Sequence, residues 1–556
     1  MIAVDATTAE RIGLVWLRAA VAPVGAFGRR HDEAIAPYGP GDEARALAEI
    51  SDVVALAARL DAGEVPRLRA ALRAVPEPSP IVARARAGDV LADVDFYELG
   101  RFADALAGLS SAWDAAGGEP GRRPPALAEL RAILAPGRSG DGFYLADTFA
   151  PELRPARAAL AAAEAEAEAR REAIAARVRD ATGVDPVGEE FVVLRDVYAG
   201  PLPDDVHVVR ETPTYRVAAL TVLSPERDAA LARLSEAEDA ARRTLAERIG
   251  AEAGPVAEAT RALGALDRLL ARVAFTQRWS GCVPAFADGE LALDDAAFAP
   301  LAEALAVRGR RYVPLSLRVR GVAVLTGPNM GGKSAALATA GFVCACAALG
   351  VPPPARRAQF PLFSSIAWVG GEGPQERARL LSSYAAEVLR ARETLRTAGV
   401  GALVLVDEFA RTTGPREGRA LLVAFVEALR ARGVCALVAT HFDEIAEAAG
   451  VPHLRIAGLD PAALAGIRTS DLDAVLDAIN AAMDYRVVST RDGKAVSDAL
   501  ALARLLGLDA ELVERARALH DAPHSEPVPL QCRQLPSPEP SHPAHEFPEP
   551  PQPPHV

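Results

Sequence analysis

The stretch GPNMGGKS at residues 327–334 constrains the fold most, because it requires a strand before it and a helix after it. The apolar run VAVL (322–325) precedes it, and a segment of helical composition, SAALATAGFVCACAAL (334–349), follows. A loop with the pattern G-x-x-x-x-G-K-[ST] wraps backbone N–H groups around phosphates at a helix N-terminus. The sequence therefore predicts an α/β domain that contains a phosphate-binding loop.

Each position of this loop has an expected role. Lys333 should reach the β- and γ-phosphates, and Ser334 should place its hydroxyl on Mg²⁺. The chain avoids lysine and keeps only Lys333 and Lys494. A compact ammonium fits beside phosphates where a planar guanidinium does not, which explains a lysine at this position. The other expected nucleotide-binding residues of the loop are Gly327, Pro328, Asn329, Met330, Gly331 and Gly332.

Two further apolar runs end in polar residues suited to ATP hydrolysis. ALVLVDE (402–408) ends in Asp407, which we interpret as a Mg²⁺ ligand, directly or through water, and Glu408, which we interpret as the base that activates water. VCALVATH (434–441) ends in His441, a candidate γ-phosphate sensor. Ligands bind at the carboxyl edge of open α/β sheets, so we expect these strand ends to meet there.

Length and composition limit the remaining choices. A chain of 556 residues predicts about two to four domains. It has no uninterrupted apolar run of about 18 residues and no signal-peptide pattern at its start, so we expect a cytoplasmic protein without a membrane partner. The net charge of -13 argues against a broad, non-specific grip on nucleic acid. The five cysteines form no CxxC pair, and we interpret them as small buried side chains.

The residue composition and the hydrophobic pattern change along the chain. Residues 1–150 are of mostly helical composition, and His31 among them is interpreted as a solvated surface residue. Long alanine- and glutamate-rich helices are expected at 155–181 and 225–249, with a small sheet between them. Strand–turn–helix units follow from about 310 to 470, and helices from 471 to 520. Residues 521–556, rich in proline, are expected to be disordered.

Together, TGPNMGGKS, VLVDEFARTTGPREG and ATHFDE resemble the ATPase domain of the MutS family of DNA mismatch repair proteins. The resemblance implies an ABC-type P-loop ATPase that uses ATP and Mg²⁺ and forms a homodimer, or a heterodimer with a related subunit. The segment LLSSYAAEV (380–388), with Ser382, Ser383, Tyr384 and Glu387, resembles the family's signature segment, which helps to complete the partner subunit's nucleotide site. Tyr312 is a candidate to stack on adenine, and a packed core tyrosine is the equal alternative.

The resemblance also implies a division of the chain. It predicts a helical core-like domain over 1–150, a two-helix lever arm over 151–275 with a β-rich clamp-like tip at 184–224, and a MutS-type ATPase domain over 276–470. Residues 471–520 would be a helical dimerisation segment. Two ordinary helices packed on a domain remain the alternative to the lever arm.

Several features depart from the family's pattern. We expect this short chain to lack the mismatch-reading domain. Over 184–224 the sequence has three arginines and seven acidic residues, a net charge of −4, whereas a tip that grips DNA should be basic. After Glu408 the family usually has glycines and small hydroxyl residues, but this chain has FARTTGPREG, in which Ala410 and Pro415 alter the turn.

Two functions therefore remain open. The first is a DNA-associated MutS-like ATPase that binds duplexes without reading mispairs. The second is an ATP-driven remodelling or reactivation factor for a protein client. For the second, DVLADVDFYELGRFADAL (89–106) resembles a MutS-like subgroup associated with adenosylcobalamin-dependent aminomutases.

Overall fold

The computed structural model describes most of the chain as two compact units. One unit is Met1–Asp460 with Met483–Lys494, and the other is Pro461–Ala482 with Ala495–Val556. The described residues are 2–140, 142–188, 190–328, 331–370, 383–411, 413–459, 482–489, 500, 503 and 507–521. In the second unit they include the helix α21 (Ala510–Asp521). Most of the predicted helical segment 471–520 and the whole proline-rich tail from residue 522 lie outside them. The prediction of helix was wrong for Met483–Ser489, which form an edge strand of the main sheet by pairing with the strand His453–Leu459.

A six-stranded sheet forms the centre of the α/β part, as the sequence predicts. Its order is β10-β11-β12-β8-β13-β14, with every neighbouring pair parallel except β13 and β14. The strands are β8 (Val322–Thr326), β10 (Ser365–Val369), β11 (Ala402–Asp407), β12 (Cys435–Ala439), β13 (His453–Leu459) and β14 (Met483–Ser489). The strands alternate with helices along the chain, which confirms a P-loop type of α/β architecture.

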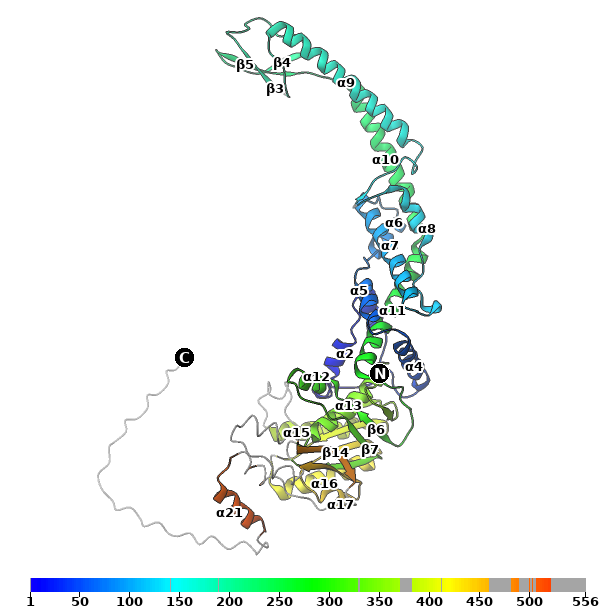
Figure 1. The fold of residues 1–556 in the computed structure, drawn as a ribbon, viewed down its shortest axis with the longest axis vertical. Helices are drawn as coiled ribbons and strands as arrows, with labels where there is room; N and C mark the ends of the chain where they lie inside the picture. Colours follow the sequence, from blue (N-terminus) through cyan, green and yellow to red (C-terminus); the bar gives the residue numbers. More distant parts are fainter. Residues whose placement is uncertain are drawn as a thin grey trace, which may run out of the picture. The chain divides into compact units, whose positions relative to one another are not determined.

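Helices cover both faces of this sheet (Figure 1). Successive residues of β8 face opposite sides, so Ala323 and Leu325 pack with α13, whereas Val322 and Val324 pack with α16. Strands buried on both faces read as continuous apolar runs, which is why VAVL and ALVLV stand out in the sequence. The helices are α13 (Lys333–Ala348), α15 (Ser383–Thr397), α16 (Pro415–Ala431) and α17 (Ile445–Ala449).

A second, three-stranded antiparallel sheet and the start of the chain join the same core. The sheet has the order β7-β6-β9. Its strands are β6 (Leu291–Ala296), β7 (Leu315–Val319) and β9 (Arg357–Gln359), with α12 (Ala299–Val307) beside them. The helix α1 (Ala6–Arg11) buries Thr7 and Thr8, and α2 (Leu14–Ala20) buries Leu14 and Leu17 in the cluster that contains α13. Segments about 300 residues apart in sequence therefore share one core.

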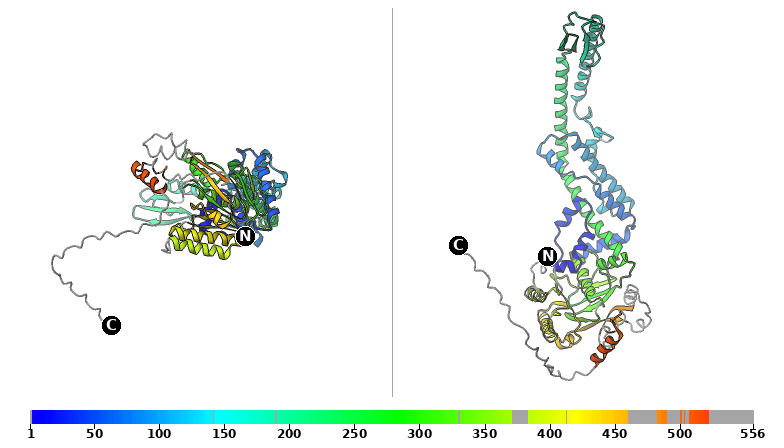
Figure 2. Two further views of the ribbon diagram at one scale, coloured as in Figure 1. Left: turned by 90° about the horizontal axis from the view of Figure 1, so that it is seen from below. Right: turned by 90° about the vertical axis from the view of Figure 1, so that its left-hand side faces the viewer.

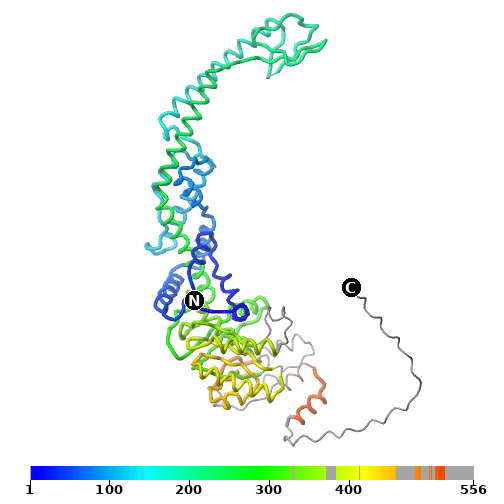
Figure 3. The backbone as a smooth tube through the Cα atoms, turned by 180° about the vertical axis from the view of Figure 1, so that it is seen from behind, coloured from blue at the N-terminus to red at the C-terminus, as the bar shows by residue number. Residues whose placement is uncertain are grey.

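Helices from the first 150 residues lie along α11 (Ala253–Trp279) (Figure 3). Buried residues recur along the length of α11. Leucines and phenylalanines of the neighbouring helices fill this second cluster. The helices are α3 (Ala26–Glu33), α4 (Glu43–Arg59), α5 (Glu64–Arg73), α6 (Ser79–Ala87), α7 (Asp93–Ala115) and α8 (Ala128–Leu134). Short elements follow: η1 (Pro120–Arg122), η2 (Ala135–Gly137), β1 (Arg138–Ser139) and β2 (Gly142–Phe143).

Two long helices, α9 (Leu153–Thr182) and α10 (Pro225–Ala251), pack along each other (Figure 2). Between them lie β3 (Glu190–Leu194), β4 (Val206–Glu211) and β5 (Tyr215–Leu220), paired antiparallel in the order β3-β5-β4. The alternating pattern of the sequence thus correctly predicts a small sheet here. The names lever arm and clamp, and the predicted domain boundaries, stay predictions.

Three smaller findings complete the description. Cys344 and Cys346 are buried, as expected, whereas Cys282 and Cys435 are half-buried, and these four described cysteines are free thiols. His31 is half-buried, so its interpretation as a solvated residue was wrong, and burial lowers its pKa. None of the helices in the described stretches is both long and apolar enough to cross a membrane.

Candidate nucleotide site

The three strand ends singled out in the sequence meet at one edge of the main sheet. Asp407, the last residue of β11, is paired with Ala439, the last residue of β12. Ala439 is in turn paired with Leu325 of β8, just before the glycine-rich loop. The loop, the carboxylates after β11 and the histidine after β12 therefore follow three adjacent strands, which is the geometry of a ligand site at a carboxyl edge.

The glycine-rich loop turns tightly between β8 and α13. Gly332 is the N-cap of α13 and has φ 87, a conformation that costs glycine little. A Cβ on Gly331 would lie 2.8 Å from the carbonyl oxygen of Pro328, and one on Gly327 would lie 3.0 Å from Cβ of Ile456. Gly331 is needed because the loop folds back on its own backbone, and Gly327 because the side chain of Ile456 on β13 lies close to it. Asn329 and Met330 lie outside the described residues.

Lys333 is the first residue of α13 and reaches back over the loop. Its side chain is 6% exposed. Nζ donates hydrogen bonds to the carbonyl oxygens of Gly327 (2.9 Å) and Pro328 (3.1 Å) and lies 3.6 Å from Oε1 of Glu408. The ammonium thus stands between the loop and the catalytic carboxylate expected after β11.

Ser334 and Asp407 are joined directly. The Ser334 hydroxyl donates a hydrogen bond of 3.0 Å to Oδ1 of Asp407. Burial raises the pKa of Asp407, and the hydrogen bond from Ser334 opposes this rise. A hydroxyl and a carboxylate side by side are oxygen ligands of the kind that Mg²⁺ takes together with substrate phosphates.

Glu408 continues from β11 into a strained turn. Its N–H donates to the carbonyl oxygen of Ala439 (3.0 Å), and its Oε2 lies 3.0 Å from a guanidinium nitrogen of Arg411. Glu408 has φ 53 and Ala410 has φ 63, which are left-handed conformations of non-glycine residues. Such conformations cost roughly 1–2 kcal/mol per residue and concentrate at functional sites.

The remaining predicted residues, in the part of the chain that the structure describes, form no hydrogen bond or ion pair with Lys333, Ser334, Asp407 or Glu408. His441 follows β12, is exposed, and its ring lies 4.1 Å from that of Phe442. The Tyr312 hydroxyl accepts a hydrogen bond from the N–H of Phe298 (3.0 Å) and lies 3.2 Å from Oγ1 of Thr339. These contacts tie Tyr312 to α12 and α13, and its adenine role stays a prediction. Ser382 and the side chain of Ser383 lie outside the described part of the chain.

Three contacts near the site were not foreseen from the sequence. Glu387 of α15 accepts a hydrogen bond from the N–H of Ala410 (3.0 Å). Tyr485 of β14 lies against the loop, since a Cβ on Gly332 would be 3.1 Å from its ring. His453 lies 2.8 Å from Oγ1 of Thr326, and burial lowers its pKa. These contacts join residues far apart in sequence, so local patterns could not indicate them.

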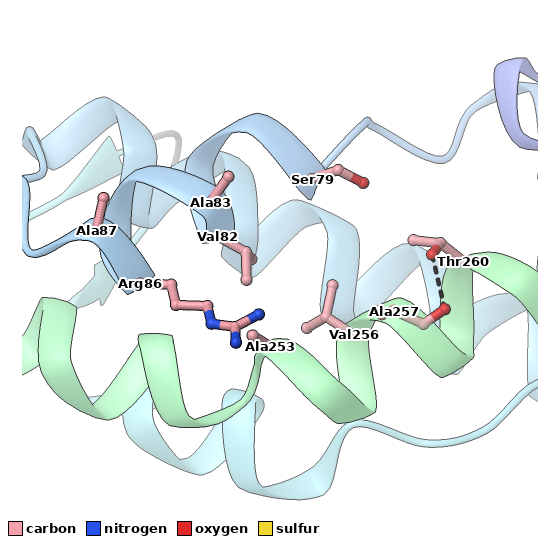
Figure 4. Close-up of a pocket in the computed structure, with 9 residues that line it drawn as sticks. All are labelled: Ser79, Val82, Ala83, Arg86, Ala87, Ala253, Val256, Ala257 and Thr260. Carbon is pink, nitrogen blue, oxygen red and sulfur yellow. Dashed lines mark hydrogen bonds between the residues drawn. The ribbon is translucent and has the colours of Figure 1, made fainter.

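A groove elsewhere in the molecule takes no part in this site. It has a volume of about 440 Å³ and lies between α6 and α11, where small apolar residues such as Val82 and Val256 line it (Figure 4). Its charged lining residue is Arg86. The groove contains none of the residues that the sequence singles out.

Comparison with known proteins fits this geometry. The family MutS domain V matches residues 323–522. Endonuclease MutS2 of Pelotomaculum thermopropionicum is 30% identical over 287 residues, which are 50% of this chain and 33% of that protein. Endonuclease MutS2 of an Anaeromyxobacter species is 35% identical over 219 residues, 38% of this chain and 25% of that protein.

A third relative carries a different name. The DNA mismatch repair protein MutS of Granulibacter bethesdensis is 33% identical over 215 residues, 37% of this chain and 23% of that protein. The matched part of the chain therefore spans a third or less of each of these relatives. The loop, the two carboxylates and the parallel sheet all lie in or beside the matched region, so the part of the chain that carries the site is similar to MutS domain V.

Proposed function

We propose that the chain binds ATP at the edge formed by β8, β11 and β12 and hydrolyses it to ADP and phosphate. Proteins with a MutS domain V are ATPases. The observation that carries the proposal is the meeting of Lys333, Asp407 and Glu408 within one connected set of contacts. A cation, a metal-ligating pair and a base are the groups that phosphoryl transfer to water requires.

Each residue has a distinct role in this proposal. Lys333 moves from the loop carbonyls to the β- and γ-phosphates, and Ser334 and Asp407 hold Mg²⁺. When bound, the ion neutralises charge that develops on the phosphate oxygens. Glu408 accepts a proton from the attacking water, and His441 contacts the γ-phosphate.

Loss of Lys333 tests this assignment. The variant Lys333→Ala should lose ATP affinity by at least about tenfold, because a charge-assisted contact to phosphate contributes about 1.5–3 kcal/mol. Arg320→Ala is the matched control, since it also removes a cation near β8 but an exposed one paired with Glu290. Unchanged ATP binding by Lys333→Ala in a calorimetric titration would exclude the proposed site.

Dimerisation belongs to the same proposal. Ser382 and Ser383 would complete the nucleotide site of a partner subunit, which would be a second copy or a related chain. ATP binding would then close the dimer, and hydrolysis would reopen it.

Duplex DNA is the first candidate for what the ATPase acts on. Its support is the similarity to MutS domain V and to two kinds of relative, which are named endonuclease MutS2 and DNA mismatch repair protein MutS. Binding by phosphate contacts should weaken steeply as salt increases. Absence of duplex binding at low salt in a fluorescence-anisotropy titration would remove this candidate.

A protein client is the second candidate, and the sheet between α9 and α10 favours it. Two of its three arginines are engaged by charged or backbone groups: Arg195 pairs with Glu211, and Arg216 is buried and donates to the carbonyl oxygens of Tyr198 (3.0 Å) and Gly200 (2.9 Å). The third, Arg210, is exposed and donates to the Tyr215 hydroxyl at 3.1 Å. The cations of Arg195 and Arg216 are therefore poorly available to phosphates.

The open face of the same sheet carries an apolar patch. Val192 is 48% exposed and Leu194 is 47% exposed. They pair with Val217 and Tyr215 of β5, so these four side chains lie on one face. Exposed apolar patches typically mark protein contacts. The resemblance of residues 89–106 to the aminomutase-associated subgroup gives little further support to a protein client. Its apolar residues Phe96, Leu99, Phe102 and Leu106 are fully buried and serve in packing.

The two candidates can be separated with one pair of substitutions. Val192→Asp combined with Leu194→Asp should abolish capture of a protein client by the ATP-bound protein and leave ATP affinity unchanged. Val307→Asp, at an 84% exposed position of α12, is the matched control. Loss of duplex binding in the double variant, but not in the control, would favour DNA instead.

A further inference from the structure

The turn after Glu408 has a left-handed backbone at residues that are not glycine. Ala410 has φ 63, although its methyl group disfavours a left-handed backbone. Glu408, two residues earlier, also has a left-handed backbone, with φ 53. Something other than local preference must therefore keep the chain in this conformation.

Contacts from two helices hold the turn. Glu387 of α15 is buried, and its Oε2 accepts the hydrogen bond from the N–H of Ala410 at 3.0 Å. Phe409 is buried and its ring lies 5.0 Å from that of Phe425 in α16. On α16, Gly418 allows the close approach, since a Cβ there would lie 2.8 Å from the carbonyl oxygen of Ala410.

We propose that Glu387 is a positioning residue for ATP hydrolysis. Its carboxylate fixes the amide of Ala410, and thereby fixes the direction in which Glu408 presents its own carboxylate toward the nucleotide. The inference rests on the proposed ATPase function and adds to it a residue that does not touch the reacting atoms.

The place of Glu387 on its helix gives this contact a second consequence. α15 begins at Ser383, one helical turn before Glu387. The serines there are those expected to complete a partner subunit's nucleotide site. A shift at the start of α15 would therefore reach Glu408 through one turn of helix and one hydrogen bond.

The test compares two substitutions of Glu387 in the full chain. Glu387→Met keeps the length of the side chain but removes the strong acceptor, whereas Glu387→Gln keeps an acceptor oxygen. We expect Glu387→Met to lower kcat by about 10- to 100-fold, the effect of a small misplacement of a catalytic group, with ATP affinity changed less than about threefold. Glu387→Gln should keep kcat within about threefold of the starting protein, because a neutral acceptor still restrains the turn.

A further substitution separates positioning from general damage. Ala410→Gly removes the methyl group that opposes the left-handed turn, so the double variant Glu387→Met/Ala410→Gly should regain part of the lost kcat. If Glu387→Met does not fold, Glu387→Asp, which withdraws the carboxylate by one methylene, should show the same loss of kcat.

The outcomes distinguish this inference from the proposed function. A starting protein that does not hydrolyse ATP would overturn the proposed function itself. A starting protein that hydrolyses ATP, with Glu387→Met equal to it in kcat, would overturn only the positioning role. An equal loss of kcat in Glu387→Met and Glu387→Gln, with no recovery in the double variant, would also overturn the positioning role. If Glu387 acts by restraining the turn, the variant that keeps an acceptor oxygen should retain more activity than the variant that lacks one.

Discussion

The change Asp32→Asn probes a buried ion cluster at the far end of α13. Arg268 and Arg272 of α11 face Asp32 of α3 and Glu49 of α4, with Asp32 Oδ1 lying 2.9 Å from both guanidinium groups. Arg272 also donates to the carbonyl oxygen of Leu349, the C-cap of α13, at 3.1 Å. Two cations and two anions thus neutralise one another at the C-terminal end of α13, where the helices around α11 contact it.

The expected loss follows from the burial of these groups. The Arg272 side chain is 2% exposed, and burial lowers its pKa. Removing one partner of a buried ion pair costs about 3–5 kcal/mol, because the other charge is left uncompensated. Asp32 is 32% exposed, so water can replace part of its interaction. We therefore expect Asp32→Asn to lower the free energy of unfolding by about 2–3 kcal/mol, below the range for a fully buried pair.

Urea unfolding followed by tryptophan fluorescence measures this loss. Trp279 lies at the end of α11, and its ring packs 6.1 Å from that of Trp16, so the signal reports on this region. Glu64→Gln is the control, because Glu64 pairs with Arg67 on the surface and should contribute no more than about 1 kcal/mol. Equal unfolding free energies for Asp32→Asn and Glu64→Gln would refute the claim that this buried, charge-balanced ion cluster stabilises the fold.

Two other substitutions give predictions for the α/β unit. Burial raises the pKa of Asp407, so the folded state favours its protonated form and loses stability as pH rises through that raised pKa. Asp407→Asn should therefore melt at a higher temperature than the starting protein near neutral pH, and the gap should close as pH falls; a gap that widens at low pH would contradict this. Gly341→Ala should lower the unfolding free energy by about 1–3 kcal/mol, because a Cβ there would lie 2.6 Å from Ile12 and 2.9 Å from Leu405. Gly108→Ala, in a helix with open space around it, is the control and should be neutral or stabilising in the same denaturant titration.

The candidate site was largely predictable because its signals are local. A glycine-rich loop, a strand that ends in two carboxylates and a strand that ends before a histidine each occupy a short stretch of sequence. Parallel strands buried on both faces give uninterrupted apolar runs, so β8, β11 and β12 could be recognised. The rule that ligands lie at the carboxyl edge then brought Lys333, Asp407 and His441 to one side of the sheet.

The contacts that support the site could not be predicted, because they join residues that are far apart in the sequence. Glu387 and Ala410 are 23 residues apart, and Asp32 and Arg272 are 240 apart. The sequence placed Glu387 in the segment that resembles the family's signature, but not against Ala410, and an aspartate such as Asp32 in a helical segment normally indicates a solvated surface. Only the folded chain shows that these carboxylates meet a backbone amide and two buried guanidinium groups. The sequence did indicate an altered turn at Ala410, but not what holds it.

The variant Glu408→Gln tests the central claim most directly, because it removes the proposed base and changes little else. Its ATP affinity should stay within a few-fold of the starting protein, since Lys333 and the loop are intact. Its rate of ATP hydrolysis, measured as phosphate release at saturating ATP and Mg²⁺, should fall by about 10²- to 10⁴-fold, the contribution of a general base. Hydrolysis by Glu408→Gln at the rate of the starting protein would contradict the account.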